Sequence, residues 1–130
     1  MVAGKNLINT SLPVQIFGEQ SNIEVILGGY KHSPKFLEPA AINNNAVERM
    51  KNIFCFRIFI SLNLIIMKKP FNPLLGETYQ GFIDGCPIYG EQISHHPPIT
   101  SVYMVGRGYK VYGTFESKAH LGFNNVCGGN

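Results

Sequence analysis

The residues with the most distinctive chemistry are two adjacent histidines, His95 and His96, followed directly by Pro97 and Pro98. A proline fixes its own backbone and pushes the preceding residue out of the helical region. We therefore expect His96 to be extended and the pair to lie where a strand is entered or interrupted. Imidazoles donate hydrogen bonds and change charge near physiological pH, which suits a phosphate or another anion. A purely structural role stays open, because adjacent side chains of a strand point to opposite faces.

A second polar pair, Lys69 and Asn72, lies in the segment Lys68–Glu77. Pro70 and Pro73 exclude both a helix and a regular strand there. Taken alone, a lysine pair is usually a solvated surface, and an asparagine before a proline is usually a turn former. The types and spacing of these residues therefore do not by themselves assign a site.

An enzyme is the rival class, namely a hydrolase or phosphatase with a histidine as general acid or base. The sequence has no Gly-x-Ser-x-Gly or Walker-type motif, and its acidic residues are scattered. Adjacent histidines rarely converge on one metal ion. Three widely spaced cysteines, Cys55, Cys86 and Cys127, are interpreted as reduced thiols. We therefore predict no catalytic activity, no metal and no cofactor.

The composition, 45% hydrophobic and 15% charged, is typical of one globular domain. A formal net charge of +3 is compatible with an anionic membrane surface and too small to indicate nucleic acid. The N-terminus lacks the apolar core of a signal peptide. The apolar run Ile53–Met67 is shorter than the roughly 20 residues that span a bilayer and is interpreted as a buried helix.

The N-terminal third is expected to combine extended and helical structure. Leu12–Phe17 is predicted to be extended. Ser21 and Glu24 form a capping-box pattern for a short helix over residues 22–27, which the glycines at 28 and 29 would end. Residues 30–44 contain two prolines and are predicted to be connecting structure.

Asn45 predicts the start of a longer helix, in which Glu48 reaches back to the free backbone donor. This helix is expected to be largely buried, and a strand is the competing interpretation from Ile53, where β-branched and aromatic residues are frequent. The positions that follow helical spacing are Val47, Met50, Phe54, Ile58, Ser61 and Leu62.

From Glu77 the pattern changes to a period of two. Asp84-Gly85 is a hairpin signal, and a further turn is predicted at residues 106–108. We expect strands at about 88–94, 99–105 and 109–115 in an antiparallel meander. The predicted fold class is α+β, with an extended and helical N-terminal segment before the meander.

The segment Glu91–Pro98, which reads Glu-Gln-Ile-Ser-His-His-Pro-Pro, closely resembles the fingerprint of the oxysterol-binding protein family. The segment Lys69–Glu77, Lys-Pro-Phe-Asn-Pro-Leu-Leu-Gly-Glu, resembles a second motif of that family. The resemblance runs from about Leu12 to near the end of the chain. It implies a curved, incomplete β-barrel that encloses one lipid under an N-terminal lid. Residues 1–130 would be a partial ligand-binding domain, without the lid and the C-terminal part.

The resemblance also implies a function, namely lipid transfer between membranes. A sterol or another lipid and phosphatidylinositol 4-phosphate would share one cavity, in a cytoplasmic protein with peripheral contact to anionic intracellular membranes. By resemblance, Lys69, Asn72, His95 and His96 bind the phosphate headgroup. Glu91 and Gln92 receive no role, although polar groups at a rim are one interpretation. The alternatives are a non-functional or regulatory fragment and, less favoured, a phosphate-ester hydrolase.

Four aromatic residues are left between two interpretations, because each could line a lipid cavity or an ordinary core. They are Tyr79, Phe82, Tyr89 and Tyr103.

Overall fold

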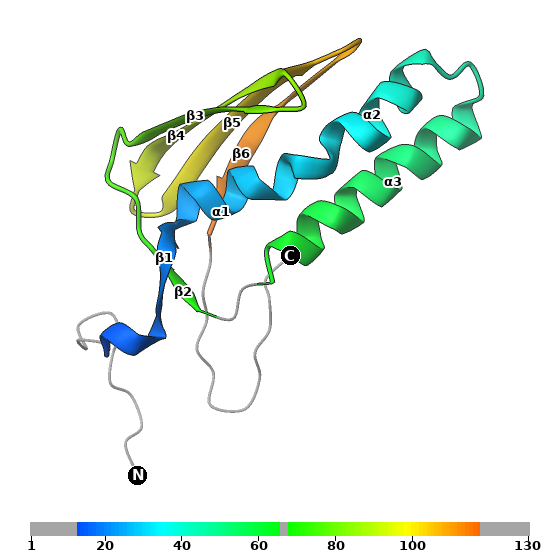
Figure 1. The fold of residues 1–130 in the computed structure, drawn as a ribbon. Helices are drawn as coiled ribbons and strands as arrows, with labels where there is room; N and C mark the ends of the chain where they lie inside the picture. Colours follow the sequence, from blue (N-terminus) through cyan, green and yellow to red (C-terminus); the bar gives the residue numbers. More distant parts are fainter. Residues whose placement is uncertain (1–12, 66–67, 118–130) are drawn as a thin grey trace.

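A layer of helices covers one face of a four-stranded sheet in the computed structural model, which describes residues 13–65 and 68–117 (Figure 1). The helices are α1 (Asn22–Gly28), α2 (Ser33–Ile42) and α3 (Ala46–Asn63), with short 3-10 turns at Val14–Ile16 and Gly29–His32. The strands are β1 (Phe17–Ser21), β2 (Lys69–Phe71), β3 (Thr78–Ile83), β4 (Cys86–His95), β5 (Pro98–Gly106) and β6 (Tyr109–Glu116).

The main sheet has the strand order β3-β4-β5-β6, and every neighbouring pair is antiparallel. Its turns follow the sequence signals. Asp84 and Gly85 have φ values of 48° and 78° between β3 and β4, and Gly108 has a φ of 81° between β5 and β6. Such left-handed conformations match the twist of a tight hairpin. The predicted meander is therefore confirmed, and the strands described here do not close into a barrel.

A separate small sheet precedes the meander. β2 pairs in parallel with β1, with Phe17 opposite Lys69. Two local predictions are corrected here, because Lys69–Phe71 is a short strand despite Pro70, and Val14–Ile16 is a 3-10 turn rather than extended. A proline is tolerated in this strand because the sheet has only two strands and each has a free edge.

The capping box of α1 is confirmed. The Glu24 amide donates to the Ser21 hydroxyl, and the Ser21 amide donates to the Glu24 carboxylate at 2.9 Å. The α-helix ends at Gly28, as the glycines predict, but Gly29 keeps a right-handed helical conformation and a 3-10 turn leads directly into α2. The prediction of connecting structure over residues 30–44 is therefore wrong. Pro34 lies in the first turn of α2, where no backbone donor is needed, and Pro39 is accommodated inside the helix.

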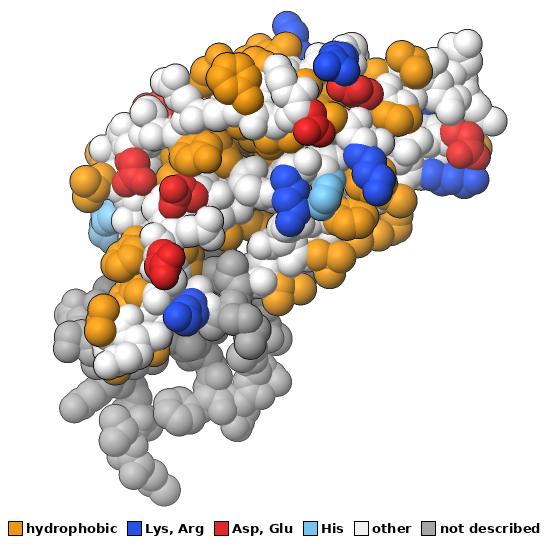
Figure 2. Space-filling view, viewed as in Figure 1, with side chains coloured by type: hydrophobic (Ala, Val, Ile, Leu, Met, Phe, Trp, Pro, Cys, Tyr) orange, Lys and Arg blue, Asp and Glu red, His pale blue; other side chains and the backbone are white. Residues whose placement is uncertain are grey.

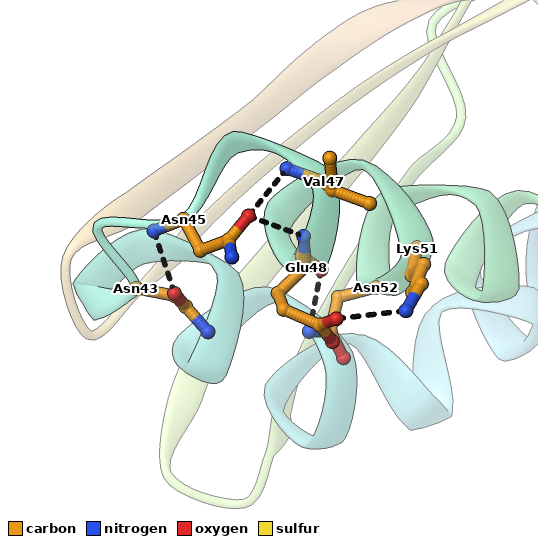
Figure 3. Close-up of polar contacts among 6 residues, drawn as sticks. All are labelled: Asn43, Asn45, Val47, Glu48, Lys51 and Asn52. Atoms are coloured by element: carbon orange, nitrogen blue, oxygen red, sulfur yellow. Dashed lines mark hydrogen bonds and ion pairs between the residues drawn. The ribbon is translucent and has the colours of Figure 1, made fainter.

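The start of α3 is capped by a side chain (Figure 3). Asn45 Oδ1 accepts hydrogen bonds from the amides of Val47 at 2.9 Å and Glu48 at 3.4 Å. Glu48 does not reach back as predicted, because the Asn45 amide donates to Asn43 Oδ1 at 2.8 Å. The Glu48 carboxylate pairs instead with Lys51 at 2.7 Å. The helix start is therefore predicted correctly, but the predicted hydrogen bond from the Asn45 amide to the Glu48 side chain is wrong.

The burial of α3 also differs from the prediction. Of this helix only Phe56 and Ile60 are buried, and both belong to the core, where Phe56 packs on Tyr30 with ring centroids 6.0 Å apart. The apolar positions at helical spacing lie on the outer face, where the exposed fractions run from 42% at Ile58 to 66% at Met50. Because α3 is apolar on nearly every side, spacing alone does not tell which face packs. No helix in the described ranges is long and apolar enough to cross a membrane.

The hydrophobic core lies between the helices and β4–β5. Its side chains come from both layers, so burial of apolar surface holds α1 and α3 against the sheet. The central members are Ile23, Ile26, Leu27, Tyr30, Phe56, Ile60, Ile88, Val102 and Met104.

Candidate functional site

The two histidines lie at the turn between β4 and β5. β4 ends at His95, which is paired with Pro98, and the His96–Pro97 peptide bond is cis. Both imidazoles are exposed, and their ring centroids are 4.5 Å apart at an interplanar angle of 64°. The rings therefore contact each other rather than point to opposite faces. Two donors on a short turn are accessible to an anion.

Lys69 presents a positive charge on β2, beside aromatic rings. Its Nζ lies 4.9 Å from the centroid of the Phe17 ring, and this ring stacks on Phe71 at 5.2 Å. The ammonium also lies 3.4 Å from Asn72 Oδ1 and 3.4 Å from the Pro70 carbonyl oxygen. These hydrogen bonds are long, so they hold the ammonium only loosely.

No carboxylate among the described residues forms an ion pair with Lys69, since the two ion pairs there join other residues. The ammonium therefore keeps its charge available for an anionic ligand.

The loop after Asn72 is fixed by its own hydrogen bonds. The Leu74 amide donates to the Glu77 carboxylate at 2.9 Å, and the Glu77 amide donates to the Leu74 carbonyl at 3.0 Å. Gly76 adopts a φ of 79°, a conformation that a side chain would disfavour. This turn leads the chain from β2 directly into β3.

The two motifs are joined through the backbone of Gln92. The Gly76 amide donates to the Gln92 carbonyl at 2.8 Å, and the Gln92 amide donates to the Glu77 carbonyl at 2.9 Å. These bonds extend the β3–β4 ladder, in which Thr78 lies opposite Glu91. The loop that follows Lys69 and the strand that ends at His95 therefore form one connected unit.

The sequence prediction and the geometry agree only in part. Lys69 and Asn72 lie together, and so do His95 and His96, but no hydrogen bond or ion pair in the described part of the chain links the two pairs. Gln92 is not at a rim, because only 1% of it is exposed. Its position, in register with buried Ile88 and Gly90, was the signal that could have identified it.

The four aromatic residues left open by the sequence are all exposed and do not belong to the buried core. Tyr89 and Tyr103 lie side by side, with ring centroids 6.4 Å apart, and help to line a hollow of about 190 Å³. A larger hollow of about 350 Å³ lies between α2, α3 and β6, where apolar side chains are accompanied by Arg57 and Lys110. Hydrophobic side chains also reach the surface at many places on the face shown in Figure 2.

Comparison with known proteins places this geometry in a family. A family model described as oxysterol-binding protein matches residues 1–126. Oxysterol-binding protein 9 of Dictyostelium discoideum is 36% identical over an alignment that covers 100% of this chain and 30% of that protein. Human oxysterol-binding protein-related protein 3 is 32% identical over 82% of this chain and 12% of its own length. The chain thus spans less than a third of these relatives.

Solved structures show the same fold. The Osh1 ORD domain in complex with ergosterol has a TM-score of 0.69 and 28% identity, over 80% of this chain and 25% of that one. The Osh3 ORD of Saccharomyces cerevisiae in complex with PI(4)P has a TM-score of 0.76 and 23% identity, over 92% and 32%. With the family model matching nearly every residue, the chain belongs to the oxysterol-binding protein family.

Proposed function

We propose that this chain forms part of a lipid-binding and lipid-transfer domain that recognises the headgroup of phosphatidylinositol 4-phosphate. In this proposal His95 and His96 donate hydrogen bonds to phosphate oxygens, Lys69 supplies a fixed positive charge, and Asn72 lies near the headgroup. The observation that carries the proposal is the connection of both motifs through the two backbone hydrogen bonds of Gln92. Charge-assisted hydrogen bonds of this kind are the strong ones in phosphate recognition.

A second lipid would compete for the same cavity. Solved relatives are complexes with ergosterol, with cholesterol and with PI(4)P. If a sterol or another lipid and phosphatidylinositol 4-phosphate exclude each other, a carrier can exchange one for the other between two membranes. The net charge of +3 supports peripheral contact with an anionic, cytoplasmic membrane surface.

The test is extraction of fluorescent sterol and of phosphatidylinositol 4-phosphate from liposomes by the 130-residue chain, beside binding of a soluble short-chain phosphatidylinositol 4-phosphate. The variant His95→Ala/His96→Ala should weaken headgroup binding by roughly tenfold or more, since it removes two donors to a charged group. His32→Gln is the matched control, because His32 packs on Phe59 at 5.0 Å and lies on the helical layer.

Unchanged headgroup binding by the double variant would contradict the proposed site. Failure of a folded wild-type chain to bind either lipid would favour the alternative of a non-functional or regulatory fragment. Sustained release of inorganic phosphate by pure protein would instead favour a hydrolase.

A further inference from the structure

Gln92 places a polar side chain in the protein interior, where polar groups need hydrogen-bond partners. It is 1% exposed on β4, and Thr100, opposite it on β5, is also 1% exposed. The Thr100 hydroxyl donates a hydrogen bond of 2.6 Å to Gln92 Oε1. Apolar side chains at these two positions would have avoided the cost of burying polar groups. The pair therefore indicates a role beyond packing.

The β4–β5 ladder changes register next to this pair. Gln92 lies opposite Thr100, whereas Ser94 lies opposite Ile99, so β4 carries one extra residue across this step. Gln92 Nε2 donates a hydrogen bond of 2.8 Å to the Ser94 carbonyl oxygen and thus spans the bulge. A shift of one residue reverses the face to which the following side chains point. The bulge therefore sets the direction of His95.

The backbone of Gln92 makes two further hydrogen bonds on its other side. Its amide donates to the Glu77 carbonyl, and its carbonyl accepts from the Gly76 amide. These two residues end the loop that begins at Asn72, directly after β2, on which Lys69 lies. The side chain of Gln92 thus makes two hydrogen bonds near the turn that carries His95 and His96, and its backbone makes two hydrogen bonds to the end of the loop that follows Asn72.

We infer that Gln92 is a positioning residue, which fixes the direction of His95 and His96 relative to β2 with Lys69 and the following loop with Asn72. This inference rests on the proposed function, because it assigns Gln92 a role in headgroup recognition by those residues. The side-chain amide suits the task, because it accepts from Thr100 and donates to Ser94 at the same time. In enzymes a displacement of reacting groups by about 1 Å can lower the rate roughly a hundredfold, and misdirected hydrogen-bond donors should likewise lower the affinity for a headgroup.

A purely structural role for Gln92 makes different predictions, and two substitutions separate the cases. Gln92→Met keeps the length of the side chain but removes both hydrogen bonds. Gln92→Glu keeps the shape and the acceptor for Thr100, but its carboxyl group donates to Ser94 only when it is protonated. Burial raises the pKa of such a carboxyl group, so the donor returns as the pH falls. Gln80→Met is the matched control, because Gln80 is exposed on β3.

The first measurement is the affinity of the 130-residue chain for soluble short-chain phosphatidylinositol 4-phosphate, with far-UV circular dichroism as the check of folding. Gln92→Met should bind roughly tenfold more weakly than the wild type, and Gln80→Met should bind equally well. The ratio of the affinity of Gln92→Glu to that of the wild type should rise toward one as the pH is lowered from about 8 to about 5.5. Division by the wild-type value removes the effect of histidine protonation.

The outcomes separate this inference from the proposed function. If His95→Ala/His96→Ala loses binding but both Gln92 variants bind as the wild type does, the positioning role is wrong and the site assignment stands. A ratio for Gln92→Glu that stays flat with pH also overturns the positioning role. If the histidine variant keeps full affinity, the proposed function itself is wrong.

The second measurement needs no ligand, so it also decides the case in which the wild type does not bind. Long-range ¹H–¹⁵N spectra report the imidazole signals of each histidine. Gln92→Met should move the signals of His95 and His96 and leave His32 unchanged. Thr100→Val should move the same signals by less, and it replaces Gln92→Met if that variant does not fold. Unmoved signals in the folded variant would overturn the inference.

Discussion

Gly90 lies where α1 crosses β4, and substitution by alanine tests whether close packing fixes the helical layer on the sheet. A Cβ atom at Gly90 would lie 2.6 Å from Leu27 Cδ1, 3.0 Å from its Cδ2 and 3.3 Å from Ile23 Cγ1. Carbon atoms normally pack at about 3.5–4.0 Å. Leu27 is 2% exposed and Ile23 is 1% exposed, and both belong to the packed core, so a methyl group at Gly90 fits only if these side chains shift.

The expected cost follows from this overlap. Gly90→Ala should lower the free energy of unfolding by about 1–3 kcal/mol, the usual range for an overpacked core. Leu27→Ala should cost about 2–5 kcal/mol by itself, because it leaves a cavity. The double variant should cost less than the sum of both, since Leu27→Ala removes the two atoms that the new methyl group meets.

Gly113 supplies a matched control from the same row of the sheet. Gly90 and Gly113 both lie opposite Val102, on the two strands that flank β5. Within residues 13–65 and 68–117, no atom lies within 4 Å of a Cβ placed on Gly113. Gly113→Ala should therefore change the free energy of unfolding by no more than about 0.5 kcal/mol.

The assay is urea unfolding at constant pH, followed by far-UV circular dichroism, with the free energy taken only where the slope against urea is unchanged. Equal costs for Gly90→Ala and Gly113→Ala would refute the reasoning. Strict additivity of Gly90→Ala and Leu27→Ala would refute the assignment of the overlap to Leu27.

Two further predictions concern charge. Lys69→Met should weaken binding of soluble phosphatidylinositol 4-phosphate by roughly tenfold and should make the affinity less dependent on salt. Lys68→Met removes the neighbouring charge and should change the affinity little. Equal losses of affinity for the two variants in a binding titration would contradict a specific role for Lys69. Burial raises the pKa of both Tyr30 and Tyr109. Because the unfolded phenols lose their protons first, the free energy of unfolding should fall as the pH rises above about 10. Urea unfolding at alkaline pH checks this, and Tyr109→Phe should reduce the slope.

Local chemistry made the meander and two helix starts predictable. Asp84-Gly85 identifies a hairpin because of its left-handed conformation, and Ser21 and Asn45 identify helix starts because their side chains accept from free backbone amides. α2 was missed because Pro39 normally interrupts a helix. Its cost is offset here by tertiary packing, since Leu37 belongs to the core and α2 lies along α3. Local sequence does not contain that packing.

The candidate site was predictable to the extent that its residues are exposed and chemically distinctive. His95, His96, Lys69 and Asn72 lie within two short motifs, so the resemblance to the family is enough to propose them as site residues without any tertiary information. The contribution of Gln92 depends on a bulge between β4 and β5 and on a contact with Thr100, eight residues away. Such a contribution follows from the register of the sheet, which the sequence pattern does not specify.

Headgroup recognition and enclosure of a lipid tail make different demands on this chain. The four proposed headgroup residues lie on one connected unit, held by the hydrogen bonds of Gln92 to Gly76 and Glu77. The tail needs an apolar enclosure, yet the outer face of α3 is open to water, and the hollow beside Tyr89 and Tyr103 holds about 190 Å³. The hollow between α2, α3 and β6 holds about 350 Å³, at the lower end of the range for ligand pockets, and the charged side chains of Arg57 and Lys110 help to line it. Pockets for molecules the size of a drug hold roughly 300–1,000 Å³. We therefore expect the 130-residue chain to bind a soluble headgroup more readily than it extracts a whole lipid. Headgroup binding without extraction from liposomes would mean that the site is correct but lacks an enclosure for the tail. Loss of both would mean that the site assignment is wrong.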